Sequence, residues 1–309
     1  HRMDFGKLAR VDHIRFDLPS EDARNSVLLN QRFPNPNLGV YIGGPVWTCP
    51  QWIGKVYPPD IRPRDYLHAY AQQFNSIELN SSFYRIPNVT QVQSWRNSVP
   101  PDFKFAPKLH QDISHFKTLA LAQEALKVFW ECISHFEENL GLCFLQLPPH
   151  LDFQYWSSIQ RILEQVPDPR KLAVEFRHSS WFNQRTLRPE VFDYFLAKEI
   201  SAVMTDVAGR RDVLHSSVPT RRVLIRFTGN ELHPSDFARI DLWVGRLLEW
   251  IRKGIEEIYF FIHQPTEAEV PELVQDLVEL LNARGHLSLR SWSPTQKPAL
   301  PSNEQMSLF

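Results

Sequence analysis

Polar and charged side chains follow a series of short apolar runs along the chain. The clearest case is SIELN at residues 76–80, in which Ile77 and Leu79 alternate with Glu78 and Asn80. Further runs end in Lys108 and His110, Gln146, Glu175, Arg177 and His178, Asp206, Arg226, and His263 with Gln264. Burying an ionised group is costly unless the group is paired. Because polar and charged residues recur at the ends of the apolar runs, we predict that they lie together in one site.

The residue types in this set suit proton transfer on a small polar substrate that is sugar-like, phosphorylated or carboxylated. Glu78 and Glu175 are candidates for general acid and base, because two carboxylates in different environments can divide these roles. Lys108 is a third catalytic candidate, which could hold an anion or a carbonyl group. A guanidinium group can bind a carboxylate or phosphate through two parallel hydrogen bonds. With residues just beyond the runs included, the predicted substrate-binding set is Trp47, Asn80, His115, Gln146, Arg177, His178, Trp181, Asp206, Arg226 and His263.

Two other interpretations fit the same residues. Glu78, Glu175, Asp206 and His263 are ligand types that a hard divalent cation accepts, as in a metal-dependent hydrolase or nuclease. No HxH, HExxH or CxxC spacing supports a metal, so metal and cofactor remain unassigned. Alternatively, the charged residues form a structural ion network in a non-catalytic binding protein. A serine nucleophile is disfavoured because the chain has no GxSxG motif.

Eight apolar runs have the length and composition of β-strands. They cover residues 40–45, 76–80, 103–109, 142–148, 172–177, 201–207, 222–229 and 258–264. Segments with helical periodicity lie between most of them, at 63–74, 120–136, 153–166, 188–199, 235–254 and 267–285. Residues 208–221 have no helical period, so we expect a loop in place of one helix.

Strands that alternate with helices predict a parallel sheet covered on both sides. Eight such units in about 250 residues are typical of a TIM-type (β/α)8 barrel, which we predict for residues 40–288. A polar N-terminal extension at 1–39 and a polar tail at 289–309 would flank it. A doubly wound open sheet is the competitor, but YIGGPVW lacks a GxGxxG or GxxxxGK[ST] loop. A barrel would bring the polar strand ends to one rim.

The bulk composition is that of an ordinary globular protein. Among 309 residues, 34 are Lys or Arg and 35 are Asp or Glu, for a net charge of -1. This balance disfavours nucleic acid or an anionic membrane as a partner, so we expect a small polar or anionic ligand. The 3 cysteines form no CxxC pair, which favours a reducing, cytoplasmic setting. No apolar run reaches the length of about 18 residues that a membrane span requires.

Several long segments resemble a known family. LHAYAQQFNSIELNSSFYRIP, LCFLQLPP and LAVEFRHSSWF are similar to the YecE-like proteins, also called domain-of-unknown-function family 72. The resemblance runs from about Val40 to about Asn282, and implies a fold similar to TIM barrels without an established activity. The matching positions are Trp47, Tyr57, Glu78, Asn80, Phe83, Tyr84, Lys108, His115, Gln146, Pro148, Glu175, Arg177, Trp181, Asp206 and Arg226. The chain departs from the family pattern at Thr228, where a histidine is usual, and at His263 and Gln264, where two asparagines are usual.

Overall fold

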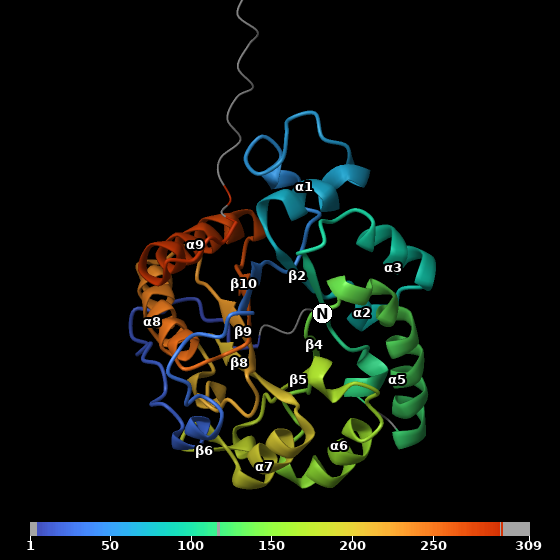
Figure 1. Ribbon diagram of the computed structural model, residues 1–309, viewed down its shortest axis with the longest axis vertical. Coiled ribbons are helices and arrows are strands. Elements are labelled where there is room, and N and C mark those ends of the chain that lie inside the picture. Colours follow the sequence, from blue (N-terminus) through green and yellow to red (C-terminus); the bar gives the residue numbers. More distant parts are fainter. Residues whose placement is uncertain (1–4, 116–117, 291, 293–309) are drawn as a thin grey trace, which may run out of the picture.

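Parallel β-strands lie in the middle of the molecule, and helices surround them (Figure 1). The computed structural model describes residues 5–115, 118–290 and 292. The parallel strands are β1 (Gly39–Gly43), β2 (Ser76–Leu79), β3 (Lys104–Pro107), β4 (Cys143–Gln146), β5 (Leu172–Glu175), β8 (Ser201–Asp206), β9 (Arg222–Thr228) and β10 (Glu257–His263). Each overlaps one predicted run, so the eight predicted strands are confirmed. A short antiparallel hairpin of β6 (Phe182–Asn183) and β7 (Thr186–Leu187) adds two strands that the sequence does not predict.

The strands form a central parallel sheet of six and a separate parallel pair. The larger sheet has the order β1-β10-β9-β8-β5-β4, and β2 pairs with β3. Between β3 and β4 there are two isolated parallel bridges, Phe105 with Leu140 and Lys108 with Phe144. Because β2, β3 and β4 have only 4 residues each, they offer few positions for lateral hydrogen bonds. Among the described residues the ladder is not continuous, so the α/β class is confirmed but a closed TIM-type barrel is not.

Helices occupy the predicted intervals. They are α1 (Tyr66–Gln73), α5 (Leu119–Ile133), α6 (Trp156–Leu163), α7 (Pro189–Lys198), α8 (Pro234–Arg252) and α9 (Val270–Gly285). Three more, α2 (Ser81–Tyr84), α3 (Val89–Arg96) and α4 (Gln111–Ser114), lie where no helix is predicted. The short 3-10 turns are η1 (Ala23–Val27), η2 (Pro50–Trp52), η3 (Pro63–Asp65), η4 (Ser134–Asn139), η5 (Phe153–Tyr155), η6 (Pro169–Lys171), η7 (Ser179–Trp181), η8 (Arg211–Val213) and η9 (Glu267–Glu269). The interval 208–221 contains only η8, which confirms the predicted loop.

The alternation of side chains along the strands separates two apolar regions. Successive side chains of a strand point to opposite faces. One set forms a small inner cluster, which contains Ala106, Leu142, Phe144, Ala173, Val203, Leu224, Tyr259 and Phe261. The other set, such as Val174, Met204 and Ile225, joins the larger core beneath the helices. Two positions beyond six members of the inner cluster lie Lys108, Gln146, Glu175, Thr205, Arg226 and His263, so these polar side chains are directed to the same side as that cluster.

The N-terminal extension packs against the loop that replaces a helix. The side chain of Asn25 donates to the carbonyl of Ser216 at 2.8 Å and accepts from the amide of Val218 at 2.7 Å. Ser217 donates to the buried carboxylate of Asp22 at 2.6 Å. In Figure 1 this dark-blue segment lies beside β6. Of the predicted tail at 289–309, all but residues 289, 290 and 292 lie outside the described residues.

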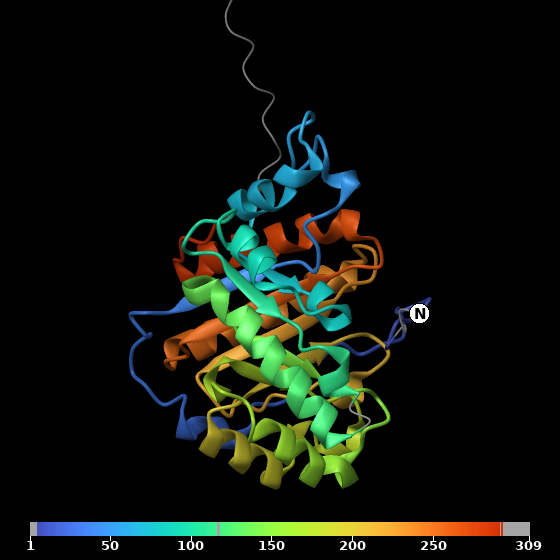
Figure 2. The same cartoon turned by 90° about the vertical axis from the view of Figure 1, so that its right-hand side faces the viewer.

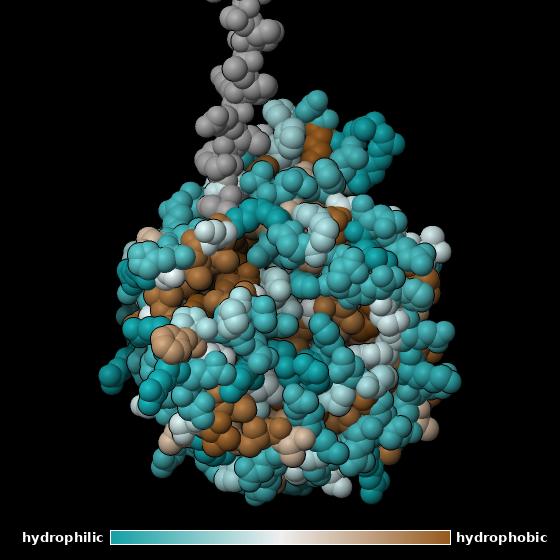
Figure 3. Space-filling model, in the orientation of Figure 1, coloured by the Kyte–Doolittle hydropathy of each residue, from teal (hydrophilic) through white to brown (hydrophobic). Residues whose placement is uncertain are grey.

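The visible surface is mainly hydrophilic, with smaller apolar areas between the hydrophilic ones (Figure 3). None of the helices in the described part of the chain is both long and apolar enough to cross a membrane.

Candidate functional site

Arg226 lies at the centre of a buried ion network. Its Nε and Nη2 atoms donate to the two carboxylate oxygens of Glu78, each at 2.9 Å. Its Nη1 atom donates to Oε2 of Glu175 at 2.8 Å. Both glutamates have 0% exposure and Arg226 has 8%. A charge buried in this way is tolerated only with close partners, and the arginine is the shared partner of both carboxylates.

Hydrogen bonds saturate the carboxylate of Glu175. Its Oε2 accepts from Arg226 and from Nε2 of Gln146, both at 2.8 Å. Its Oε1 accepts from Nε of Arg177 and from the hydroxyl of Thr205, both at 2.9 Å. An ionised carboxylate has about four acceptor sites, so none is left for a substrate.

Glu78 is saturated in the same way. In addition to the two bonds from Arg226, its Oε1 accepts from Nδ2 of Asn80 at 2.9 Å. Nε2 of His263 lies 3.1 Å from Oε2. The predicted pair of Glu78 and Asn80 is therefore part of the network: Glu78 binds Arg226, and Asn80 binds Glu78.

The arginines keep both glutamates ionised. Burial alone would raise the pKa of Glu175, but Arg177 and Arg226 outweigh it and lower the pKa to about 2. Burial would likewise raise the pKa of Glu78, but Arg226 and His263 hold it well below its usual value. Both residues are therefore anions at neutral pH and poor proton donors there.

Lys108 has the opposite electrostatic character. Its Nζ donates to Oε1 of Gln146 at 2.8 Å and lies 3.9 Å from the centroid of the Phe83 ring. Burial lowers the pKa of Lys108 to about 7, and the positive charge of Arg226 contributes to this shift. The amine can therefore gain and lose a proton near neutral pH.

Hydrogen-bond donors around Lys108 remain available at the rim. Nε of Arg177 binds Glu175, whereas its Nη atoms have no hydrogen-bond partner within the described residues, and its side chain is 14% exposed. His115 is affected by the same positive charges. Burial lowers the pKa of His115, and the charges of Lys108, His150 and Arg177 lower it further. The rim thus presents cationic and neutral donors above two anions that are fully engaged.

Asp206 belongs to a separate network on the other side of β8. Its Oδ1 accepts from Nη2 of Arg239 and its Oδ2 from Nε1 of Trp243, both at 2.7 Å, and Arg211 also pairs with it. Burial would raise its pKa, but Arg239 and Arg211 lower it to about 2. Because side chains alternate along a strand, Asp206 faces α8 and Thr205 faces the network. The geometry does not support the predicted contact of Asp206 with a substrate.

Three other predicted residues also lie apart from the network. Trp181 has 0% exposure, and its Nε1 donates to the carbonyl of Leu151 at 2.8 Å, so it is a core residue that a substrate does not reach. Trp47 packs edge-on against Trp95, with ring centroids 5.5 Å apart. His178 accepts from the amide of Ser180 at 3.2 Å and so begins η7. These three residues follow strand ends in the sequence, but their side chains do not join the network.

The predicted metal ligands do not form a metal site, although His263 lies 3.1 Å from Glu78. Within residues 5–115, 118–290 and 292, no group of three or more His, Cys, Asp and Glu side chains is placed to hold a metal ion. Glu78 and Glu175 are engaged by arginines, and Asp206 lies in the separate network. This donor arrangement gives the metal-dependent alternative less support than the ion network.

Thr205 and Phe83 are site residues that the sequence analysis does not select. Thr205 donates to Glu175, and Phe83 lies beneath the amine of Lys108. Side chains alternate along β8, so Thr205 shares a face with Val203, whereas Asp206 shares the other face with Met204. This alternation is the signal that could have identified the threonine. Phe83 is named above only as a position that matches the family, and no local pattern places it beside Lys108, because it comes from α2, which follows another strand.

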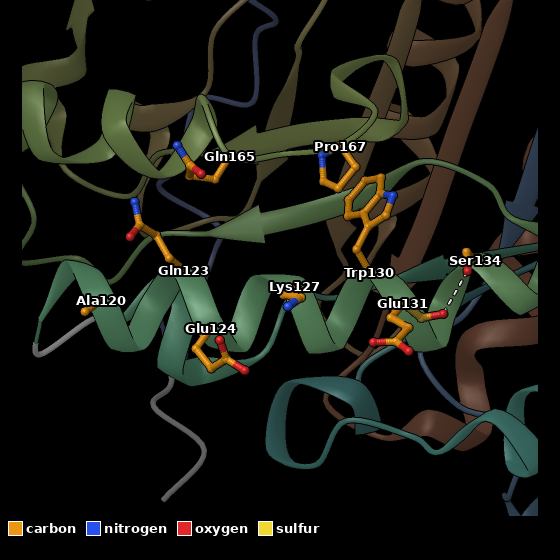
Figure 4. A pocket seen from close by; sticks show the side chains of 9 residues that line it. All are labelled: Ala120, Gln123, Glu124, Lys127, Trp130, Glu131, Ser134, Gln165 and Pro167. Atoms are coloured by element: carbon orange, nitrogen blue, oxygen red, sulfur yellow. Dashed lines mark hydrogen bonds between the residues drawn. The ribbon is translucent and has the colours of Figure 1, made fainter.

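A large surface cavity lies elsewhere on the molecule (Figure 4). It has a volume of about 640 Å³ and its lining includes Gln123, Lys127 and Trp130 of α5 together with Gln165 and Pro167. None of the ion-network residues lines it, so it is not part of the candidate site.

Comparisons with known proteins agree with one another. The family described as "Protein of unknown function DUF72" matches residues 41–298. The UPF0759 protein YecE of Escherichia coli (strain K12) is 27% identical over 290 residues, which cover 87% of this chain and 100% of that protein. UPF0759 protein YunF of Bacillus subtilis (strain 168) is 25% identical over 210 residues, which cover 62% of this chain and 70% of YunF.

Solved structures support the fold alone. The crystal structure of a DUF72 family protein from Thermotoga maritima MSB8 has a TM-score of 0.60 and 23% identity, and covers 79% of this chain and 99% of its own. One from Enterococcus faecalis V583 has a TM-score of 0.62 and 18% identity, with coverage of 81% and 99%. With the match across residues 41–298, these findings show that the chain belongs to the DUF72 family of proteins of unknown function.

Proposed function

We propose that the protein is an enzyme that binds a small anionic substrate at the rim, and that Lys108 exchanges a proton with it. The observation that carries this proposal is an amine whose pKa is lowered to about 7 by burial and by the charges of Arg226 and Arg177, together with Nη donors of Arg177 that have no hydrogen-bond partner in the part of the chain that the structure describes. A general base or acid works best when its pKa lies near the operating pH. A carboxylate or phosphate group of the substrate would accept hydrogen bonds from Arg177.

The geometry divides the roles differently from the carboxylate acid/base chemistry that the sequence suggests. Glu78 and Glu175 use all their acceptor sites on neighbouring donors, so the proposal assigns them the task of holding Arg226 and Arg177. Neutral Lys108 takes a proton from a carbon next to the substrate's anionic group and becomes an ammonium. The electron pair stays on the substrate, and Arg177 stabilises the developing charge. Return of the proton to another atom gives an isomerase, and loss of a leaving group gives a lyase.

We also propose that the two parallel sheets are parts of one TIM-type barrel, and the isolated bridges between β3 and β4 support this. In such a fold, sites lie at the carboxyl ends of the strands. We also retain a cytoplasmic location as a proposal, because Cys49, Cys132 and Cys143 are free thiols.

Anion binding is tested with inorganic phosphate and isothermal titration calorimetry at pH 6, where Lys108 is mainly protonated. Protonated Lys108 would bind the anion together with Arg177, so we expect Lys108→Met to weaken phosphate binding about tenfold, the typical effect of losing one charge-assisted hydrogen bond. In the wild type, affinity should fall as the pH rises through 7, because the ammonium loses its charge. Lys104→Met is the matched control, since Lys104 begins β3, which Lys108 directly follows, and donates to the carbonyl of Glu138. Equal affinities of the wild type and Lys108→Met would contradict the proposal.

Proton transfer is tested by deuterium exchange. Hydroxy acids, keto acids and sugar phosphates are incubated with the protein in D2O, and loss of C–H signals is followed by proton NMR. We expect exchange in at least one compound, and a reduction of about 100-fold in Lys108→Met, the lower range for a general base. Phosphate binding without any exchange would instead favour the non-catalytic binding protein.

A further inference from the structure

The first described residues of the chain lie against the candidate site. We call Phe5–Asp12 the N-terminal strap. The ring centroid of Phe5 lies 4.3 Å from Cζ of Arg177 and 4.7 Å from Cζ of Arg210. The amide of Gly209 donates to the carbonyl of Gly6 at 2.8 Å. A Cβ at Gly6 would lie 2.8 Å from Val207, and the residue has a φ of +72°, so glycine permits this close approach.

Phe5 covers the face of Arg177 and leaves its edge open. A guanidinium group stacks on an aromatic ring through its face, whereas its N–H donors point outward in its plane. One donor of Arg177, Nε, is fixed by Glu175 at 2.9 Å. The ring and the carboxylate together therefore determine the direction of the Nη donors toward the rim.

The strap also encloses a pocket at the same end of the strands. The pocket has a volume of about 470 Å³ and its lining includes Leu8, Ala9 and Val11 of the strap. The facing wall includes Val207, Thr228 and Pro265. These three follow the network residues Thr205, Arg226 and His263 by two positions each, so the pocket lies just beyond the network. In Figure 2 the start of the chain lies on the right of the molecule, beside the N label.

We propose that the N-terminal strap is a wall of the substrate site, with Phe5 as a positioning residue for Arg177 and the strap pocket as the site for the uncharged part of the ligand. The ligand class is then a small organic phosphate or carboxylate, in which an anionic group is joined to a polar body. Besides the apolar strap residues and the side chains of Thr228 and Asn230, the lining contains charged residues of both signs, which include Lys7, Arg10, Asp12 and Glu231. This mixture suits a polar body with both carbon and hydroxyl groups. This inference rests on the proposed function for the anion, and adds the rest of the ligand and the residues that contact it.

The contact of Phe5 is tested without any ligand, through the rate at which phenylglyoxal modifies Arg177, measured by mass spectrometry of peptides. We expect Phe5→Leu to raise this rate about fivefold, in line with the loss of one exposed cation–π contact. Phe5→Trp should restore the wild-type rate because it keeps an aromatic face. Phe33→Leu is the matched control, since Phe33 is an exposed residue of the same extension. A wild-type rate in Phe5→Leu would overturn the role of Phe5.

The pocket is tested by comparing inorganic phosphate with glycerol 3-phosphate as calorimetric probes. We expect Ala9→Trp to weaken glycerol 3-phosphate binding about tenfold by filling the pocket, and to leave phosphate binding unchanged. Ala120→Trp, in the outer cavity of Figure 4, is the control and should change neither affinity. Equal losses for the two probes, or no loss, would overturn the pocket assignment. Failure of the wild type to bind either probe would overturn the proposed function and the ligand class, while the phenylglyoxal rate still decides the role of Phe5.

Discussion

Replacing Arg226 with methionine is expected to destabilise the fold by about 3–5 kcal/mol, the usual cost of leaving buried charges without their partner. The methionine keeps much of the volume but removes all three hydrogen bonds to Glu78 and Glu175. Both carboxylates have 0% exposure, so water does not replace the lost donors. Urea denaturation at neutral pH measures the change in the free energy of unfolding.

Arg222→Met is the matched control for Arg226→Met. Arg222 begins the same strand and is also buried at 7% exposure, but its nearest acid, Glu256, is 3.8 Å away and partly exposed. Because this ion pair is weak, we expect its loss in Arg222→Met to lower the free energy of unfolding by about 1 kcal/mol or less. Adding Glu78→Gln and Glu175→Gln to Arg226→Met should recover part of the lost stability, because the unpaired charges are then absent. Equal losses in the two methionine variants would show that Arg226 does not carry the network.

Acid is expected to remove a large part of the protein's stability between about pH 5 and pH 2. The pKa of Glu175 is about 2 in the folded protein against 4.5 for the free group. A group whose pKa is lowered by folding stabilises the fold above its unfolded pKa, and this contribution is lost as the pH falls through the folded pKa. The difference corresponds to about 3 kcal/mol for Glu175. Asp206, with a pKa of about 2 against 3.8, adds about 2 kcal/mol.

Urea denaturation at a series of pH values tests the acid effect. Glu175→Gln should be less stable than the wild type at neutral pH but lose less stability on acidification, because it has no carboxylate to protonate. Asp60→Asn changes an exposed carboxylate and should leave the steepness of the wild-type profile intact. If Glu175→Gln and the wild type lose the same free energy between pH 5 and pH 2, the assignment of the lowered pKa to this network is wrong.

The positions of the strands and most residues of the ion network could be predicted from the sequence because local patterns determine them. Buried strands give short apolar runs, and a polar residue at the end of such a run is costly unless it meets a partner. Alternation along β8 also contained the information that Thr205, and not Asp206, faces the network. The place of a residue at a strand end does not reveal this parity, and it does not distinguish Trp181, which the core encloses, from a residue of the rim.

The parts that could not be predicted depend on contacts between distant segments. Whether short strands complete a continuous ladder depends on the lateral spacing of β3 and β4, which no local pattern records. The protonation states of Glu78 and Lys108 depend on which neighbours surround each group, since burial and nearby charges can shift a pKa in opposite directions. The stacking of Phe5 on Arg177 joins residues from opposite parts of the chain, and the polar sequence of the extension gives no indication of it.

The anchoring of the N-terminal extension has a consequence for the order of folding. Asn25 binds partners 191 and 193 residues further along the chain. Contacts between such distant segments form slowly, because a long loop must close before they stabilise the fold. We therefore expect the strands and helices to assemble before the extension docks. An intermediate with intact strands would contain the ion network but lack the contact of Phe5 with Arg177, so the proposed ligand site would be completed only after the parallel strands have formed.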